Sequence, residues 1–177
     1  MPRLFTGIEV PTEIASLLTM MRGGLPGARW IDPEHYHITL RFIGDIEDRT
    51  ADDVASALDE ICPPSFNLKI NCLGAFGSRK PHCIWAGVEK SDDLTELQAD
   101  QERLLQRMGL VPERRKYCPH ITLARLRGTS HDHVADYLNT RSLLSELSFP
   151  VERFVLFSAR ASTGGGPYLV EADYPLL

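Results

Sequence analysis

The chain has 177 residues, of which 43% are hydrophobic and 24% are charged, and its formal net charge is −5. This length suits one ordinary domain or two small lobes that share a core, and the composition is globular rather than disordered. The negative charge argues against a broad, non-specific contact with nucleic acid, which requires a basic surface, but it permits a local basic pocket for one phosphate.

Two further features bear on where the protein works. No apolar stretch approaches the roughly 18 residues that cross a bilayer, and Glu9 and Glu13 interrupt the N-terminal region where a signal peptide would be apolar. The four cysteines, at positions 62, 72, 83 and 118, form no CxxC or zinc-ribbon spacing. We therefore expect a cytoplasmic monomer with reduced thiols, no cofactor and no membrane contact; a Cys72–Cys83 pair across neighbouring strands stays open.

Hydrophobic residues alternate in some stretches and recur at helical spacing in others, with Gly and Pro between them. In chain order this pattern predicts a strand (3–10), a helix (11–22), a loop (24–35), a strand (36–44), a helix (48–62), a hairpin (66–76 with 83–89), a helix (92–109), a strand (120–126), a helix (131–140) and a hairpin (149–160 with 167–176) that turns at TGGG (163–166). We expect an α+β fold and one bilobal domain over residues 1–177, in which two similar lobes, each with an antiparallel sheet and flanking helices, surround a central cleft.

The tetrapeptide HITL occurs twice, at residues 37–40 and at residues 120–123. A chance second copy is expected in roughly one chain in a thousand of this length. Side chains at positions i and i+2 of a strand project from one face, about 6.6 Å apart. His37 and Thr39 therefore form one polar pair, and His120 and Thr122 form another. If an approximate two-fold axis relates the lobes, the two pairs face each other across the cleft.

Two opposed imidazoles suit displacement at phosphorus. With pKa values near 6.5, one ring can be neutral and take a proton from water while the other is protonated and supplies a proton to the leaving oxygen. Threonine hydroxyls can hold the phosphoryl oxygens through the transition state. A single histidine on a strand is more often structural than catalytic. The duplication in matching contexts favours catalysis.

At these residues the sequence resembles the two-histidine phosphoesterases, and among them the bacterial and archaeal RNA 2′,3′-cyclic phosphodiesterases, or 2′-5′ RNA ligase family. Besides both motifs, the similar stretches are RLFTGIEVP, RWIDPEHYHITLRFIGDI, CIWAGVE, YCPHITLAR and LFSARASTGGGPYLV, which together cover nearly the whole chain. The stretch GSRKPHCIWAGVE departs from the family, whose members usually carry a Pro- and Arg-containing turn there. Only its basic character remains, in Arg79, Lys80 and His82.

The resemblance implies metal-independent hydrolysis of a 2′,3′-cyclic phosphate at an RNA or nucleotide end, such as a tRNA fragment, to a 2′-phosphomonoester. It implies that His37 is the general acid, that His120 is the base, and that Thr39 and Thr122 hold the phosphate. The near-symmetry of the motifs leaves the assignment of acid and base reversible. The older family name also implies the reverse reaction, which joins RNA ends through a 2′-5′ linkage.

Several other residues are candidate substrate contacts. We expect Arg125, two residues after Leu123, to continue the face of His120 and Thr122 and to contact a phosphate. Arg41 follows the first motif and receives the same prediction, although a salt bridge is the ordinary alternative for either. Arg115, within the basic run ERRKY, either attracts RNA at the cleft mouth or belongs to a solvated loop.

Aromatic and histidine residues offer two further hypotheses. Trp30 and Tyr168 lie beside loops and are candidates for stacking on a base, whereas Trp85 and Phe42 are expected in the core. The pairs His35-x-His37 and His131-x-His133 have spacings that could hold a metal. The first begins in a loop and the second opens a helix, where residues two apart diverge, so no metal site is expected.

Two functions of other classes remain as alternatives to the enzyme. A non-catalytic protein could use the same cleft to bind phosphorylated RNA termini, and a metal-dependent phosphatase, whose activity a chelator would abolish, is a third option. Matched histidines and threonines in both motifs favour the metal-independent enzyme, because a binding protein needs no paired acid and base.

Overall fold

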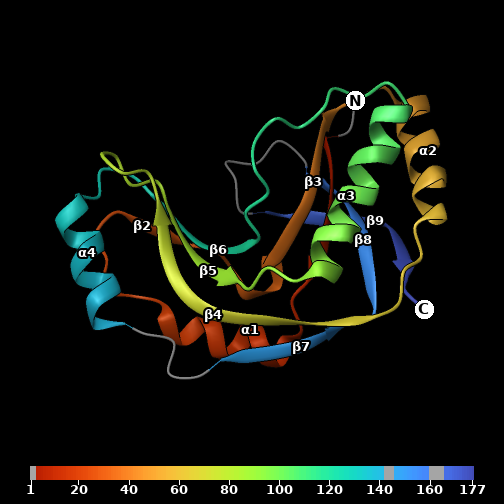
Figure 1. The fold of residues 1–177 in the computed structure, drawn as a ribbon. Coiled ribbons are helices and arrows are strands. Elements are labelled where there is room, and N and C mark those ends of the chain that lie inside the picture. Colours follow the sequence, from red (N-terminus) through yellow and green to blue (C-terminus); the bar gives the residue numbers. More distant parts are fainter. Residues whose placement is uncertain (1–2, 142–145, 160–165) are drawn as a thin grey trace.

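Nine strands form one antiparallel sheet within the residues that the computed structural model describes, which are 3–141, 146–159 and 166–177 (Figure 1). The strands are β1 (Arg3–Glu9), β2 (Ala28–Trp30), β3 (His37–Asp45), β4 (Phe66–Phe76), β5 (Cys83–Val88), β6 (His120–Leu126), β7 (Leu147–Val151), β8 (Arg153–Ala159) and β9 (Tyr168–Pro175). Their order in the sheet is β7-β4-β5-β6-β3-β1-β8-β9, and β2 pairs with β6 beside this path.

The described helices are α1 (Thr12–Leu18), α2 (Asp48–Ala57), α3 (Asp92–Arg107) and α4 (His131–Thr140), with short 3₁₀ turns at η1 (Thr19–Met21), η2 (Pro33–His35) and η3 (Leu58–Glu60). Serine side chains cap two of them: the hydroxyl of Ser91 accepts from the N–H of Leu94, and that of Ser130 accepts from the N–H of His133. The longest helix, α3, buries a leucine face against the sheet. No described helix is long and apolar enough to span a membrane.

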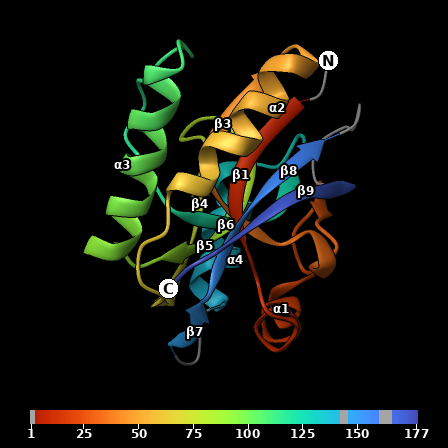
Figure 2. The same cartoon turned by 90° about the vertical axis from the view of Figure 1, so that its right-hand side faces the viewer.

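Two lobes share the sheet, as predicted. We call β3, β1, β8 and β9 the first lobe, and β6, β5, β4 and β7 with β2 the second lobe. Helices α2 and α3 gather at one end of the molecule, and α1 and α4 at the other (Figures 1 and 2). The two lobes do not carry separate sheets, because the HITL strands β3 and β6 are neighbours and join them. Their contact is the antiparallel pair Ile38–Ile121, and both side chains are fully buried.

The structure differs from the predicted elements in two places. The stretch 149–160 forms two strands rather than one: β7 ends at Val151 and pairs with β4, whereas β8 begins at Arg153 and pairs with β1. Pro150 fits this arrangement, because β7 is an edge strand and needs no donor on its outer side. The predicted loop 24–35 contains β2, which forms only because β6 offers it a partner. Most of the TGGG turn lies outside the described residues.

A buried ion pair fastens β3 to α3. Arg41 is 6% exposed, and its guanidinium pairs with the carboxylate of Glu102 and donates to the main-chain carbonyls of Phe42 and Val111. Glu102 also accepts from the N–H of Glu113 at 3.0 Å. Burial by itself raises the pKa of the Glu102 carboxyl, but these hydrogen bonds outweigh burial and lower it. The first HITL strand is thereby held to the helix behind it.

Replacing Glu102 by Ala should leave the charge of Arg41 buried without a carboxylate, and we expect a loss of about 2–4 kcal/mol in the free energy of unfolding. Urea denaturation at pH 7 measures it. Because the folded-state pKa of Glu102 is lowered, its contribution is present above the unfolded-state pKa and shrinks as the pH falls below about 4. Asp100→Ala is the matched control, since it removes an exposed pair with Arg103 on the same helix. Equal losses in the two variants would contradict the stabilising role of the buried pair.

Candidate active site

The structure brings both His/Thr pairs to one cavity at the centre of the sheet. His37 and Thr39 flank Ile38, and His120 and Thr122 flank Ile121, so the antiparallel register sets each histidine beside the threonine of the other strand. All four residues line a cavity of about 350 Å³. The intervening isoleucines are buried on the opposite face. The alternation of polar and apolar residues therefore delivers four polar side chains to one space.

Bulges at matching places in β3 and β6 decide which arginine reaches this cavity. In β3 the pairing with β1 skips Leu40, and in β6 the pairing with β5 skips Leu123. Each bulge reverses the alternation of faces beyond it. Strict alternation would place Arg41 on the cavity face and Arg125 on the opposite face. After the bulges, Arg125 lines the cavity and Arg41 is buried behind the sheet, with Phe42 lining the cavity instead.

Arg125 is exposed, and its charge acts on both catalytic candidates, because it contributes to lowering the pKa of His37 and of His120. Within the described parts of the chain, no acidic side chain forms an ion pair with it. The prediction that Arg125 lies at the cavity agrees with the structure, but the alternation argument behind it is wrong. Arg125 is three residues after Thr122 and would lie on the opposite face by strict alternation; the bulge at Leu123 returns it to the cavity. The corresponding prediction for Arg41 fails on geometry, since Glu102 and two carbonyls hold its guanidinium away from the cavity.

The two histidines are oriented in the same way. Nδ1 of His37 lies 2.9 Å from the carbonyl oxygen of His35, and Nδ1 of His120 lies 2.7 Å from that of Cys118. A carbonyl oxygen only accepts, so each Nδ1 carries the proton and donates it. Each Nε2 is consequently the atom that gains or loses a proton. This arrangement leaves two Nε2 atoms available for acid and base chemistry.

Both imidazoles are biased towards their neutral forms. Burial lowers the pKa of His37 to about 4; the hydrogen bond to His35 opposes this shift, and the charges of His120 and Arg125 add to it. The pKa of His120 is lowered by burial and by Arg125, against the hydrogen bond to Cys118. His37 packs among Phe5, Phe157 and Tyr168, with ring centroids 5.0–5.5 Å away. A bound anion would favour the protonated forms.

The threonines are also fixed by neighbouring groups. The Tyr117 hydroxyl donates to the main-chain oxygen of Thr39 at 2.9 Å and so ties the segment before the second motif to the first. The thiol of Cys83 lies 3.8 Å from the hydroxyl of Thr122. Cys83 and the other three cysteines are free thiols, so the Cys72–Cys83 pair is not formed.

Three remaining candidates have different positions. Tyr168 lines the cavity and meets the His37 ring edge-on, with centroids 5.0 Å apart. Trp30 does not line it, because its ring packs against the core and lies 5.9 Å from that of Tyr137. Arg115 is exposed in a loop away from the cavity and pairs with Glu113 at 3.4 Å. The structure therefore supports a site role for Tyr168 and gives Trp30 and Arg115 structural or solvent-exposed positions.

The cavity is cationic although the chain is acidic. Of 24 Asp and Glu residues in the chain, none lines the described part of its wall, whereas Arg3, Arg125 and four of the six histidines do. Arg3 also pairs with Asp45 at 3.3 Å across an exposed stretch of β1 and β3. Such a lining favours an anion such as a phosphate.

Sequence patterns do not predict several cavity residues. Phe5 and Phe76 line the wall and pack against His37 and His120, at centroid distances of 5.1 and 4.9 Å. Phe5 lies on β1, which pairs with the motif strand β3, whereas Phe76 lies on β4, which β5 separates from the motif strand β6. Knowledge of this strand order would have identified them. His82, recognised above only as part of a basic turn, also lines the cavity. Phe42 is 48% exposed rather than in the core.

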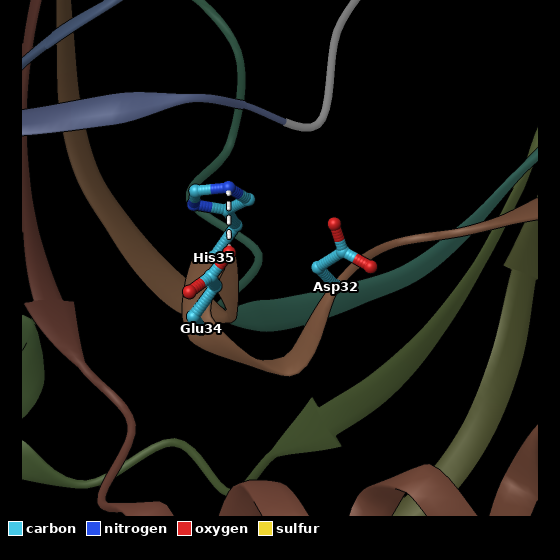
Figure 3. A group of neighbouring side chains, drawn as sticks. All are labelled: Asp32, Glu34 and His35. Carbon is cyan, nitrogen blue, oxygen red and sulfur yellow. Dashed lines mark ion pairs between the residues drawn. The ribbon is translucent and has the colours of Figure 1, made fainter.

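One group of metal-ligand side chains occurs in the described residues: Asp32, Glu34 and His35, whose ligand atoms lie within 4.8 Å of one another (Figure 3). Nε2 of His35 lies 3.7 Å from Glu34, and the His35 ring meets Tyr168 edge-on. The two acids are exposed and do not line the cavity. The histidines at 131 and 133 lie on α4, and His131 borders a different, shallow pocket. We derive no metal chemistry from these residues.

The burial of His37 leads to a test by NMR. We expect its C2–H resonance to titrate well below the ordinary pKa of about 6.5, towards about 4. Saturating adenosine 2′-monophosphate should raise this pKa, because the anion stabilises the imidazolium. His133, exposed on α4 and outside the cavity lining, is the internal control, and its resonance should not move when the nucleotide is added. A His37 pKa that does not respond to the nucleotide would place the anion away from the two motifs.

The chain is similar in sequence and in fold to proteins of one known family. The family model for LigT-like phosphoesterases matches residues 8–85 and 87–168. An RNA 2′,3′-cyclic phosphodiesterase of Aeropyrum pernix is 36% identical over 107 residues, which span 59% of this chain and 60% of that protein. The Bacillus subtilis protein of the same name is 30% identical over 162 residues, covering 88% and 87%. Crystalline E. coli LigT complexed with 3′-AMP has the same fold, with a TM-score of 0.82 over 99% of each chain at 24% identity. The chain belongs to the LigT-like family of two-histidine phosphoesterases.

Proposed function

We propose that this protein is an RNA 2′,3′-cyclic phosphodiesterase that hydrolyses the cyclic phosphate at an RNA or nucleotide end to a 2′-phosphomonoester without a metal ion. One observation carries the proposal: two His/Thr pairs, from strands that meet at Ile38–Ile121, line a single cavity without acidic side chains in its described wall. The relatives named RNA 2′,3′-cyclic phosphodiesterase support the cyclic phosphodiesterase part of this proposal.

In this proposal the two Nε2 atoms carry out both proton transfers. Nε2 of His120 takes a proton from water as the water oxygen attacks phosphorus, and Nε2 of His37 gives a proton to O3′ as the P–O3′ bond breaks. The 2′ oxygen stays on phosphorus. After the reaction His120 is protonated and His37 is neutral, and exchange with solvent restores both. Each Nδ1–H remains bonded to its carbonyl throughout, so the rings do not need to reorient.

Phosphate binding and protonation are coupled in this proposal. Burial keeps His37 neutral in the free protein at pH 7, yet the acid role requires its protonated form. The negative phosphate stabilises an imidazolium, so substrate binding itself raises the pKa of His37 towards the working range. The hydroxyls of Thr39 and Thr122 and the guanidinium of Arg125 hold the non-bridging oxygens, whose charge persists through the transition state.

The same site supports the reverse chemistry in principle. An RNA 5′-hydroxyl in the place of water would attack the cyclic phosphate and create a 2′-5′ linkage, with the same acid and base. Water is in large excess, so hydrolysis should dominate. A binding protein for phosphorylated RNA termini is the alternative function. The paired Nε2 atoms favour the enzyme, since binding requires only the positive charge.

The central test uses adenosine 2′,3′-cyclic phosphate in the presence of excess chelator. Wild-type protein should hydrolyse it, and His37→Ala and His120→Ala should each lower kcat by at least about 10²-fold while the fold is retained, because each loses one proton-transfer group. His133→Ala should retain wild-type turnover. Tight binding without turnover would support the binding protein, and loss of turnover with chelator would support a metal-dependent enzyme.

A diester with a nitrophenolate leaving group distinguishes acid from base, because this group departs without a proton. If His37 is the acid, His37→Ala should lose much less activity on the aryl diester than on the cyclic phosphate, whereas His120→Ala should lose similar factors on both. The opposite pattern would exchange the two roles, which the sequence leaves reversible.

Arg125→Ala should lower kcat/KM by about 10–100-fold, the effect of losing a charged hydrogen bond to phosphate. Arg127→Ala, which removes an exposed arginine two residues away, is the control and should change kcat/KM by less than about twofold. If Arg125→Ala matched this control, the phosphate would not bind at the guanidinium.

A further inference from the structure

The strands β1 and β5, which pair with the two motif strands, correspond to each other residue by residue. The bulge falls at the same step in both lobes. The equivalent residue pairs are Phe5–Phe42 with Cys83–Arg125, and Gly7–Thr39 with Trp85–Thr122. A pseudo-two-fold axis through the contact between β3 and β6 relates these pairs, so Cys83 takes the place of Phe5 and Thr122 that of Thr39. One lobe therefore has a thiol where the other has an aromatic ring.

Cys83 places its thiol in the wall of the active-site cavity, beside Thr122, and the residue is 1% exposed. Its Sγ lies 3.8 Å from the hydroxyl oxygen of Thr122 and 3.6 Å from the main-chain oxygen of Ile84, distances that suit the longer hydrogen bonds of sulfur. Burial raises the pKa of the thiol, although Thr122 and the charge of Arg125 oppose this shift. The thiol is therefore protonated at pH 7 and can both donate and accept.

The two threonine hydroxyls of the proposed phosphate site differ in their surroundings. In the part of the chain that the structure describes, no group forms a hydrogen bond with the hydroxyl of Thr39. At the position equivalent to Cys83, Phe5 packs its ring against His37, with centroids 5.1 Å apart, and offers neither a donor nor an acceptor. Among the described residues, a group that can fix the direction of the O–H bond is therefore found beside Thr122 and not beside Thr39.

We propose that Cys83 is a positioning residue, whose thiol fixes the hydroxyl of Thr122 so that this hydroxyl donates to a non-bridging oxygen of the phosphate. This inference rests on the proposed function and deepens it. In the complex the thiol donates its proton to the oxygen of Thr122, which leaves the hydroxyl proton directed away from sulfur and towards the phosphate. A hydroxyl held in advance loses less rotational freedom when the ligand binds. Cys83 acts on the substrate only through Thr122, and it makes Thr122 the better aligned of the two threonines.

The second acceptor of the thiol, the main-chain oxygen of Ile84, completes this role. In the free protein the hydroxyl of Thr122 donates to sulfur while the thiol donates to Ile84, so that neither proton lacks an acceptor. When a phosphate oxygen accepts from Thr122, the thiol proton turns to the threonine oxygen. Two protons rotate, and no heavy atom needs to move.

Removal of the thiol tests this role. Cys83→Ala and Cys83→Val bracket the volume of the thiol, so a loss common to both reports its hydrogen bonds rather than its size. We expect each variant to lower kcat/KM for adenosine 2′,3′-cyclic phosphate about three- to tenfold, the effect of one neutral hydrogen bond. Urea denaturation verifies that the variants are folded. Cys62→Ala removes an exposed thiol outside the cavity; it is the matched control and should stay within about twofold of wild type.

A double-mutant cycle separates positioning from packing. In a Thr122→Val background, Cys83→Ala should lower kcat/KM by less than about 1.5-fold, because the hydroxyl that the thiol serves is gone. In a Thr39→Val background the same substitution should keep its full effect. The inference is overturned by losses that multiply in the Thr122→Val background, by equal coupling to both threonines, by a loss in only one of the two Cys83 variants, or by a Cys83→Ala variant that matches Cys62→Ala.

Binding measurements keep the test independent of turnover. In calorimetry with adenosine 2′-monophosphate, Cys83→Ala should weaken binding about three- to tenfold in the wild-type background and by less than about 1.5-fold in the Thr122→Val background. A protein that shows this coupling but never hydrolyses the cyclic phosphate refutes the proposed function and leaves the positioning role supported. Hydrolysis without the coupling refutes the positioning role and leaves the proposed function supported.

Discussion

The contact between Ile38 and Ile121 is the constraint on which the site depends. It is the one bridged pair between β3 and β6 in the described residues, so the two strands touch at a point and diverge on both sides. A longer ladder of pairs between β3 and β6 would close the space between the lobes. Without any pair between these strands, the two lobes would not be aligned. With a single buried contact, the polar side chains on either side are set at fixed positions around an open cavity.

Orientation and protonation of the histidines arise from the same surroundings. The carbonyl bonds to Nδ1 fix the tautomer, and the aromatic rings around His37 remove water from it, which lowers its pKa to about 4. A free protein with neutral imidazoles avoids the cost of a buried charge. In the proposed reaction, the bound phosphate raises the pKa of His37, so that substrate binding and activation of the acid are one event. No carboxylate lines the described cavity wall, so no negative side chain there stabilises a protonated His37 before a ligand binds.

The sequence predicts the central residues because their signal is local. Period-two alternation in HITL correctly places His37 with Thr39 and His120 with Thr122, and the duplication points to the two-lobed fold. The bulges have no such signal, since they arise from pairing with β1 and β5. A one-residue slip reverses the faces beyond it, which is why Arg41 is buried although alternation places it at the cavity. Trp30 is misjudged for a related reason: β2 exists only through its pairing with β6.

Near-symmetry serves acid–base chemistry, because in-line displacement needs proton donor and acceptor on opposite sides of phosphorus. Perfect symmetry would, however, make donor and acceptor interchangeable and the product ambiguous. The first lobe departs from the second by surrounding its histidine with Phe5 and Tyr168 and by ending in Phe42. The second lobe offers Arg125 at the equivalent position. This difference in composition separates the environments of the two imidazoles, and the proposed function requires such a separation because it gives the two histidines different roles.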